Sequence, residues 1–258
     1  MCLIIWAQNM HPDYKLMLLA NRDEFYERSA LPAHFWENGL LAGKDLQAGG
    51  TWLGLQPKKG LAAVTNYRDP KLIKEKAPSR GELPLQYLTS SQSSLNYLVR
   101  LHPRAAAYNG FNLLLFDGRD VMYYSNIERI IKKADEGIHG LSNALLDTPW
   151  PKVRRCKQAL KQYIEQLEAQ PPAADDLFGI MQDTWHPPDE ELPHTGVPLE
   201  WERALASPFI RTPRYGTRLT TIILWDKHDR VAFIEKWHAT PFQEERIQRF
   251  ELQMRLLE

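Results

Sequence analysis

Cysteine is scarce in this chain, since only Cys2 and Cys156 occur among its 258 residues. Two cysteines are too few for a disulfide framework and fit a reducing compartment. Long apolar runs are also lacking, and the longest, such as 219–225, is far short of the roughly 20 residues of a membrane-spanning helix. Leu3–Ala7 is apolar, but it follows no basic segment and is too short for the core of a signal peptide. The sequence therefore predicts a cytoplasmic protein without a membrane span.

The chain also lacks an excess of charge of either sign. Its 32 Lys and Arg residues balance 32 Asp and Glu residues, so no net field is available to hold a polyanion, and nucleic acid is disfavoured as a partner. With 43% hydrophobic and 25% charged residues, the composition is that of an ordinary globular protein. Nothing in it indicates a particular protein partner.

Several familiar catalytic motifs are absent. The sequence has no phosphate loop ending in Gly-Lys-Ser/Thr, no GxGxxG, no HExxH and no GxSxG. His186 and His194 lie near acidic residues, but in a proline-rich segment without the spacing of a metal site. We therefore expect no protein metal site.

What the sequence does contain is a series of strands at both ends, with helices between them. Short apolar runs bounded by turn residues predict the strands, and apolar residues at helical spacing predict the helices. The predicted strands are Cys2–Ala7, Tyr14–Ala20, Leu40–Gly43, Thr51–Gln56, Gly60–Asn66, Phe111–Asp117, Val121–Ser125, Arg129–Lys133, Gly137–Leu141, Thr217–Trp225, Arg230–Trp237 and Arg249–Leu256. The predicted helices are Glu82–Ser90, Ser94–His102, one opened by Thr148 as its N-cap and running to about Ala169, and Asp176–Trp185.

This order of elements predicts an α+β fold with antiparallel sheets. Hairpins require antiparallel pairing, and strands that are apolar on both faces indicate burial between layers. Two packed sheets covered by helices is the simplest arrangement. We expect one domain over residues 1–258, with a surface excursion at 186–214, where proline and acidic residues are frequent. Cys156 falls on the apolar stripe of the long helix and should be buried and inert.

Cys2 is the residue that most directly suggests chemistry. If Met1 is removed, the α-amine of Cys2, with a pKa near ~7.7–8, could serve as the base for its own thiol. The oxyanion formed by attack on an amide would need neutral donors such as Asn side chains, and a nearby arginine would lower the thiol pKa. The alternative is that Cys2 is a small apolar residue that begins a buried strand.

The blocks around Cys2 resemble a known family. Met1–Ala7 and Ala20-Asn21-Arg22-Asp23-Glu24-Phe25 are similar to the family named for its Asn-Arg-Asp-Glu motif, the transport and Golgi organisation protein 2 family. The resemblance continues, in order, through blocks that cover most of the chain: Ala48–Gly54, Thr65–Arg68, Ser79–Gly81, Asn109–Asn112, Gly140–Ala144 and Arg214–Arg218.

That family in turn resembles the cholylglycine hydrolase and penicillin V acylase group, which are N-terminal-nucleophile hydrolases. The resemblance implies a four-layer αββα sandwich. It also implies roles for individual residues. Cys2 matches the nucleophile, Arg22 and Asp23 its charged neighbours (Glu24 could take the acidic place), Asn66 and Asn143 the asparagines that hold the oxyanion and the α-amine, and Arg218 a late arginine near the site. Taken singly, each of these residues also has a purely structural explanation, as a strand-end, turn or surface residue.

The resemblance to the Asn-Arg-Asp-Glu family implies ligand handling at this site, and the more distant kinship with the acylases suggests a second function by analogy alone. In the first, the protein binds and transports an amphipathic ligand, such as haem or an acyl compound. Haem would be noncovalent, because no Cys-x-x-Cys-His motif is present, and Cys2 would be its iron ligand. In the second, the protein is a thiol-dependent amide hydrolase for a small acylated substrate. The residues expected to bind the ligand are Cys2, Asn21, Arg22, Glu24, Asn66, Arg68 and Arg218.

Overall fold

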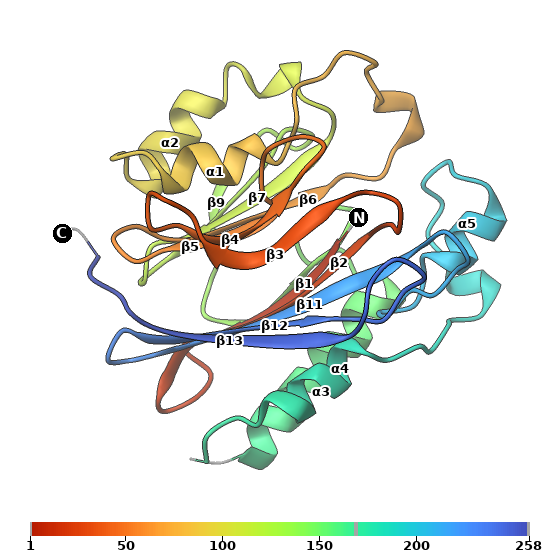
Figure 1. Ribbon diagram of the computed structural model, residues 1–258. Helices are drawn as coiled ribbons and strands as arrows, with labels where there is room; N and C mark the ends of the chain where they lie inside the picture. Colours follow the sequence, from red (N-terminus) through yellow and green to blue (C-terminus); the bar gives the residue numbers. More distant parts are fainter. Residues whose placement is uncertain (1, 168–169, 257–258) are drawn as a thin grey trace. The chain divides into compact units, whose positions relative to one another are not determined.

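The computed structural model describes residues 2–167 and 170–256, which form two compact units. The first unit comprises the chain up to Glu27 together with Glu136–Glu251. The second comprises Arg28–Asp135 together with the residues from Leu252 onward. Figure 1 shows a sheet with helices on one side in each unit. The two sheets and their helical layers are the components of the predicted α+β sandwich.

The first unit is built on a six-stranded sheet with the strand order β10-β1-β2-β11-β12-β13. The pairings β10–β1, β1–β2, β2–β11 and β11–β12 are antiparallel. Its strands are β1 Cys2–Gln8, β2 Tyr14–Phe25, β10 Gly137–Leu141, β11 Tyr215–Asp226, β12 Arg230–Trp237 and β13 Arg246–Gln253. Its helices are α3 Pro151–Leu167, α4 Ala174–Met181 and α5 Leu199–Ala204.

One face of this sheet packs on α3 and α4, which gives the unit its core. Leu3, Leu19 and Ile222 of the central strands join Cys156 and Leu160 of α3 in a single buried cluster. Cys156 is 1% exposed, as predicted, and burial raises its pKa to about 12. Alternate residues of β1, β2 and β11 point to the opposite face of the sheet. Cys2 belongs to that second face.

The second unit contains a seven-stranded antiparallel sheet in the order β3-β4-β5-β6-β7-β8-β9. Helices α1 and α2 cover it through a buried cluster that includes Leu83, Tyr87 and Leu98. Its strands are β3 Ala30–Phe35, β4 Leu41–Asp45, β5 Leu53–Gln56, β6 Gly60–Asn66, β7 Phe111–Phe116, β8 Val121–Ser125 and β9 Ile131–Lys133. Its helices are α1 Glu82–Leu88 and α2 Ser94–Leu101.

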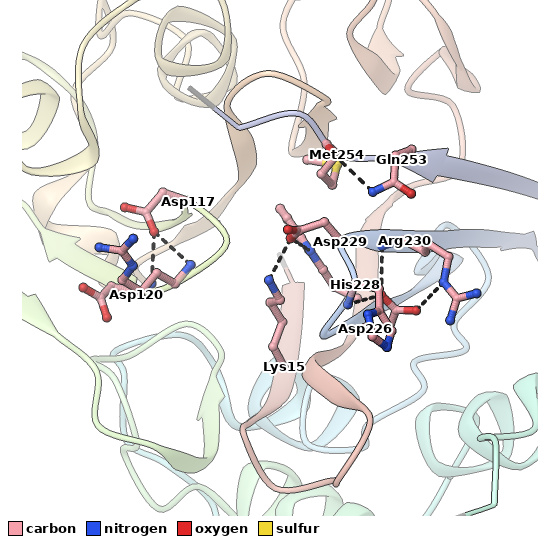
Figure 2. Close-up of polar contacts among 11 residues, drawn as sticks. Lys15, Asp117, Asp120, Asp226, His228, Asp229, Arg230, Gln253 and Met254 are labelled. Carbon is pink, nitrogen blue, oxygen red and sulfur yellow. Dashed lines mark hydrogen bonds and ion pairs between the residues drawn. The ribbon is translucent and has the colours of Figure 1, made fainter. Parts of the chain in front are cut away.

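Aspartates organise the hairpin turns. In the β11–β12 turn, Oδ1 of Asp226 accepts hydrogen bonds from the backbone N–H groups of His228 (2.8 Å) and Arg230 (2.9 Å), as Figure 2 shows. Asp229 adopts φ 63° and accepts from Lys15 Nζ at 2.7 Å, which joins this turn to the start of β2. In the β7–β8 turn, Asp117 accepts from two backbone N–H groups in the same way. Short polar side chains that bond to the backbone two residues ahead are typical of such turns.

Several predictions about the elements need correction. Strand β3 was not predicted, and β2 continues through the whole Asn-Arg-Asp-Glu motif. Thr148 is not the N-cap of α3. The first i to i+4 hydrogen bond of this helix runs from the Arg154 N–H to the Trp150 carbonyl oxygen, so the helix starts after Trp150. Segment 186–214 is not wholly a surface excursion, since it contains α5 and buries apolar residues at 205–210, which include Phe209 and Ile210. The predicted end of α3 near Ala169 lies outside the described residues, and the expectation of a single domain over 1–258 stays a prediction.

Candidate functional site around Cys2

Strands β1, β2 and β11 bring the Cys2 end of the chain to the centre of the first sheet. Cys2 pairs with Arg22 on β2, so both side chains lie on the same face. On β11, Arg22 pairs with Leu219 and Asp23 with Thr217, which leaves Arg218 as the extra residue of a β-bulge. A bulge redirects a side chain locally. Cys2, Arg22 and Arg218 therefore lie on three adjacent strands, with Arg22 on the strand between the other two.

The Cys2 side chain is half-buried, and its thiol forms no disulfide. Burial raises the pKa of the thiol above its ordinary value, the carboxylates of Asp23 and Glu24 add to the increase, and the Arg22 guanidinium opposes it. The thiol is consequently neutral near pH 7. Either a base or a metal ion is needed to convert it to the reactive thiolate.

Two guanidinium groups on this face are almost completely buried. Arg22 is 5% exposed and lies 4.0 Å from Glu24, two residues along the same strand. Arg218 is 4% exposed, donates to Gln243 Oε1 at 2.8 Å and lies over the ring of Trp237. Trp237 pairs with Leu219 and so faces the same way as Arg22. The site thus presents the Arg22 guanidinium and the Glu24 carboxylate near the Cys2 thiol, with the Arg218 guanidinium one strand further along the sheet.

The other two residues of the Asn-Arg-Asp-Glu motif point to the helical face. Asn21 donates to the carbonyl oxygens of Met181 (2.8 Å) and Pro208 (3.0 Å), and it accepts from Thr220 Oγ1 at 2.7 Å. Asn21 therefore holds the end of α4 and the segment that precedes β11 against the sheet. Asn21 was predicted from the sequence as a ligand-binding residue. In the structure its side-chain amide forms these three hydrogen bonds within the protein.

Asp23 has a similar anchoring role. Its Oδ1 accepts from Thr217 Oγ1 at 2.6 Å, and the same hydroxyl accepts from the backbone N–H of Ile210 at 2.9 Å. Asp23 is 1% exposed, yet its charge still acts on the Cys2 thiol. It is therefore a structural residue that also contributes to the electrostatics of the site.

Asn143 follows β10 and reaches Cys2 through one serine. Ser142 Oγ lies 3.0 Å from the carbonyl oxygen of Cys2 and 3.4 Å from Asn143 Oδ1. Both side chains are buried. Asn66 and Arg68, the remaining predicted site residues, belong to the second unit, at the end of β6 and two residues beyond it.

Sequence reasoning missed several residues that support this site. Trp237 and Gln243 orient Arg218, and Glu235, 1% exposed, accepts from Trp237 Nε1 at 2.6 Å. His238 lies on the helical face, where its Nε2 is 2.8 Å from Thr220 Oγ1. The signal available in the sequence was Glu235, which directly follows the apolar run 231–234.

None of the helices that the structure describes is both long and apolar enough to cross a membrane. Within residues 2–167 and 170–256, no group of three or more His, Cys, Asp or Glu side chains is placed to hold a metal ion.

Fold and site together define an α+β protein with a cysteine–arginine site at the end of the central strands of one antiparallel sheet. The chain belongs to the Transport and Golgi organisation 2 family, which it matches over residues 1–239. The resemblance predicted from the motifs is thereby confirmed.

Animal relatives match nearly the whole chain. The Transport and Golgi organization protein 2 homolog of Bos taurus is 39% identical over an alignment 258 residues long, which covers 92% of each chain. The human homolog is 37% identical, again over 92% of each chain. Drosophila melanogaster Transport and Golgi organization protein 2 is 31% identical with the same coverage.

Among solved structures, the Caenorhabditis elegans N-acylethanolamine-hydrolyzing acid amidase ortholog overlaps 86% of this chain and 92% of its own. The TM-score is 0.40 and the sequence identity 10%.

Proposed function

We propose that the Cys2 face of the first unit binds a small amphipathic ligand with carboxylate groups, and that this ligand is haem, carried within the cell without being converted. The observation that carries this proposal is the pair of buried guanidinium groups, Arg22 and Arg218, on the strands next to the half-buried Cys2: Arg22 lies opposite Cys2 on β2, and Arg218 lies on β11.

The arginines would recognise the carboxylates of the ligand. A buried guanidinium is costly unless it meets an anion or several acceptors, and carboxylate pairs with arginine are strong and directional. Arg22 already lies near Glu24, and Arg218 donates to Gln243, so both side chains are oriented before a ligand arrives. Preorganised cations favour a ligand whose carboxylates are fixed on a rigid frame, as the propionates of haem are.

Cys2 would supply the iron ligand. Haem brings an iron centre that accepts a thiolate sulfur. Because burial raises the thiol pKa, Cys2 must lose a proton on binding, so affinity should increase with pH. A neutral thiol in the absence of ligand also suits a carrier, since such a thiol reacts slowly with other electrophiles.

The proposal is tested by titrating the protein with haem and following the absorption of the bound pigment. We expect Arg22→Gln and Arg218→Gln each to weaken binding by roughly 10- to 100-fold, because each loses a charge-assisted hydrogen bond of about 1.5–3 kcal/mol. Cys2→Ala should bind with an altered spectrum, because the sulfur ligand is lost.

The matched control is Arg203→Gln, which removes an arginine paired with Asp189 at the surface of the same unit. It should leave haem affinity unchanged. If Arg22→Gln and Arg218→Gln bind haem as tightly as the parent protein while remaining folded, haem recognition at this site is wrong.

A second function is favoured by the position of Cys2 beside Arg22 and its link through Ser142 to Asn143. With Met1 removed, the α-amine of Cys2 could take the thiol proton, the sulfur could attack an amide carbonyl, and Asn143 could stabilise the oxyanion. The resulting acyl-thioester would be hydrolysed by water, with release of the amine in the first step.

Intact mass separates the two functions. A hydrolase of this kind requires that Met1 be absent. An amide substrate should then acylate the Cys2 sulfur and increase the mass of the protein by that of the acyl group, and Cys2→Ala should show no such increase. Retention of Met1 throughout the purified protein rules out the amine-assisted mechanism, whereas ligand binding requires no such processing.

A further inference from the structure

The two sheets have four edge strands, and three of them are protected against pairing with another chain. Asp147, at φ 57°, occupies the edge of β10: its N–H donates to Gly140 O and its carboxylate accepts from Gly140 N, both at 2.9 Å. Strand β3 contains Pro32 and a register shift between Leu31 and His34. Strand β9 is only three residues long. Proline, bulges, short length, charged side chains and coverage by other groups are the usual means of blocking an edge.

Strand β13, Arg246–Gln253, is the fourth edge, and only its charged side chains protect it, because it is neither short nor interrupted by proline. It is eight residues long, contains no proline and is the last strand in its sheet, next to β12 (Figure 1). Its exposure alternates. Arg249 and Glu251 are exposed on one face, whereas Gln248, Phe250 and Leu252 are half-buried on the other. A long edge strand without proline is a template for a further strand.

We propose that β13 pairs with β13 of a second copy of this chain, antiparallel and about a two-fold axis at Phe250, so that two six-stranded sheets become continuous. The occupant of the edge is thus the same strand, related by symmetry. Such an isologous contact is the commonest form of dimer interface.

Geometry restricts the register of this pairing. Residues opposite each other in an antiparallel pair point to the same face. Because the copies are identical, the half-buried face of one strand continues into the half-buried face of the other only when the two-fold axis passes through a residue position. An axis between two residues would place a half-buried residue opposite an exposed one. An axis at Arg249 would oppose two arginines, and an axis at Glu251 would oppose two glutamates.

An axis at Phe250 avoids both repulsions. It places Arg249 opposite the partner copy's glutamate, and Glu251 opposite the partner copy's arginine, on the exposed face. It also sets the two Phe250 rings side by side, next to the Phe233 ring that already contacts Phe250 at a centroid distance of 6.2 Å. Within one chain, Arg249 Nε already donates to Glu251 Oε1 at 2.6 Å. The dimer would therefore join two such pairs into a group of four alternating charges.

The test is charge reversal followed by mixing, with the full chain studied by sedimentation equilibrium from about 1 to about 500 μM. The parent protein should dimerise. Arg249→Glu and Glu251→Arg should each weaken the dimer by about 10-fold or more, because both cross-strand pairs become repulsive and each pair is worth roughly 0.2–1 kcal/mol. Both side chains are about 60% exposed, 59% and 60%, so the monomer should remain folded.

Mixing the two variants distinguishes pairing between chains from effects within one chain. A chain with Glu at 249 and 251 meets a chain with Arg at both positions, so all cross-strand pairs become attractive and an equimolar mixture should form heterodimers. The matched control is Arg203→Glu, which reverses a charge in an exposed ion pair elsewhere in the unit and should not alter dimerisation. A parent protein that stays monomeric over this range, or single variants that dimerise as well as the parent, would overturn the proposal.

Discussion

His238 shows how a single buried side chain connects the first sheet to the segment before β11. Its ring packs edge-on against Phe209, with centroids 4.6 Å apart, and its Nε2 lies 2.8 Å from Thr220 Oγ1. Thr220 in turn donates to Asn21. Burial lowers the pKa of His238 to about 4, and the positive charges of Lys236 and Arg211 contribute to this decrease.

The neutral histidine predicts a specific pH dependence of stability. The folded pKa is about 4, against an ordinary value of 6.5, so the unfolded chain binds the proton more readily. The contribution of neutral His238 to the free energy of unfolding is fully present above pH 6.5. It is lost as pH falls through 4, and the total loss is about 2–3 kcal/mol. Urea unfolding of the parent protein between pH 7 and pH 4 should show this decrease, and His238→Gln should lack it.

His228→Gln is the matched control, because His228 is an exposed histidine in the β11–β12 turn, at the other end of β12 from His238. It should follow the pH dependence of the parent protein. Equal pH dependence in the parent protein and in His238→Gln would mean that His238 is not the group whose protonation destabilises the fold.

At the residue scale, the candidate site residues could be chosen from the sequence, but the face of the sheet to which each side chain points could not. Strand alternation sends Arg22 and Glu24 to the Cys2 face, and Asn21 and Asp23 to the helical face. That division could have been predicted only if β2 had been extended through the motif. The bulge at Arg218 could not have been predicted, because it depends on pairing between strands nearly 200 residues apart.

At the element scale, most strands and helices could be predicted because their signals are local. The β11–β12 hairpin is signalled by apolar runs on either side of an Asp-rich turn, and α2 by helical spacing after the Ser93 cap. Strand β3 was missed because Ala30–Phe35 contains a proline and alternates poorly, and it is a strand only through its neighbour β4. Thr148 resembled an N-cap in sequence, but helical bonding begins two residues later.

At the scale of the whole molecule, each unit repeats one plan: an antiparallel sheet with helices on one face. The plan leaves the other face of the first sheet to carry Cys2, Arg22 and Arg218, with a helical layer behind it to fix the strands. Placing two buried guanidinium groups on a rigid sheet limits their rearrangement when a ligand binds. The central claim is therefore that these two arginines bind the carboxylates of an amphipathic ligand.

The most direct measurement compares haem with its dimethyl ester, in which both propionates are neutral, on the parent protein and on the Arg22→Gln/Arg218→Gln double variant. The account predicts that esterification weakens binding to the parent protein by at least about 10-fold and has little effect on the variant, because the lost charge pairs are the same in both cases. If the ester binds the parent protein as tightly as haem does, the arginines do not recognise carboxylates and the central claim is contradicted.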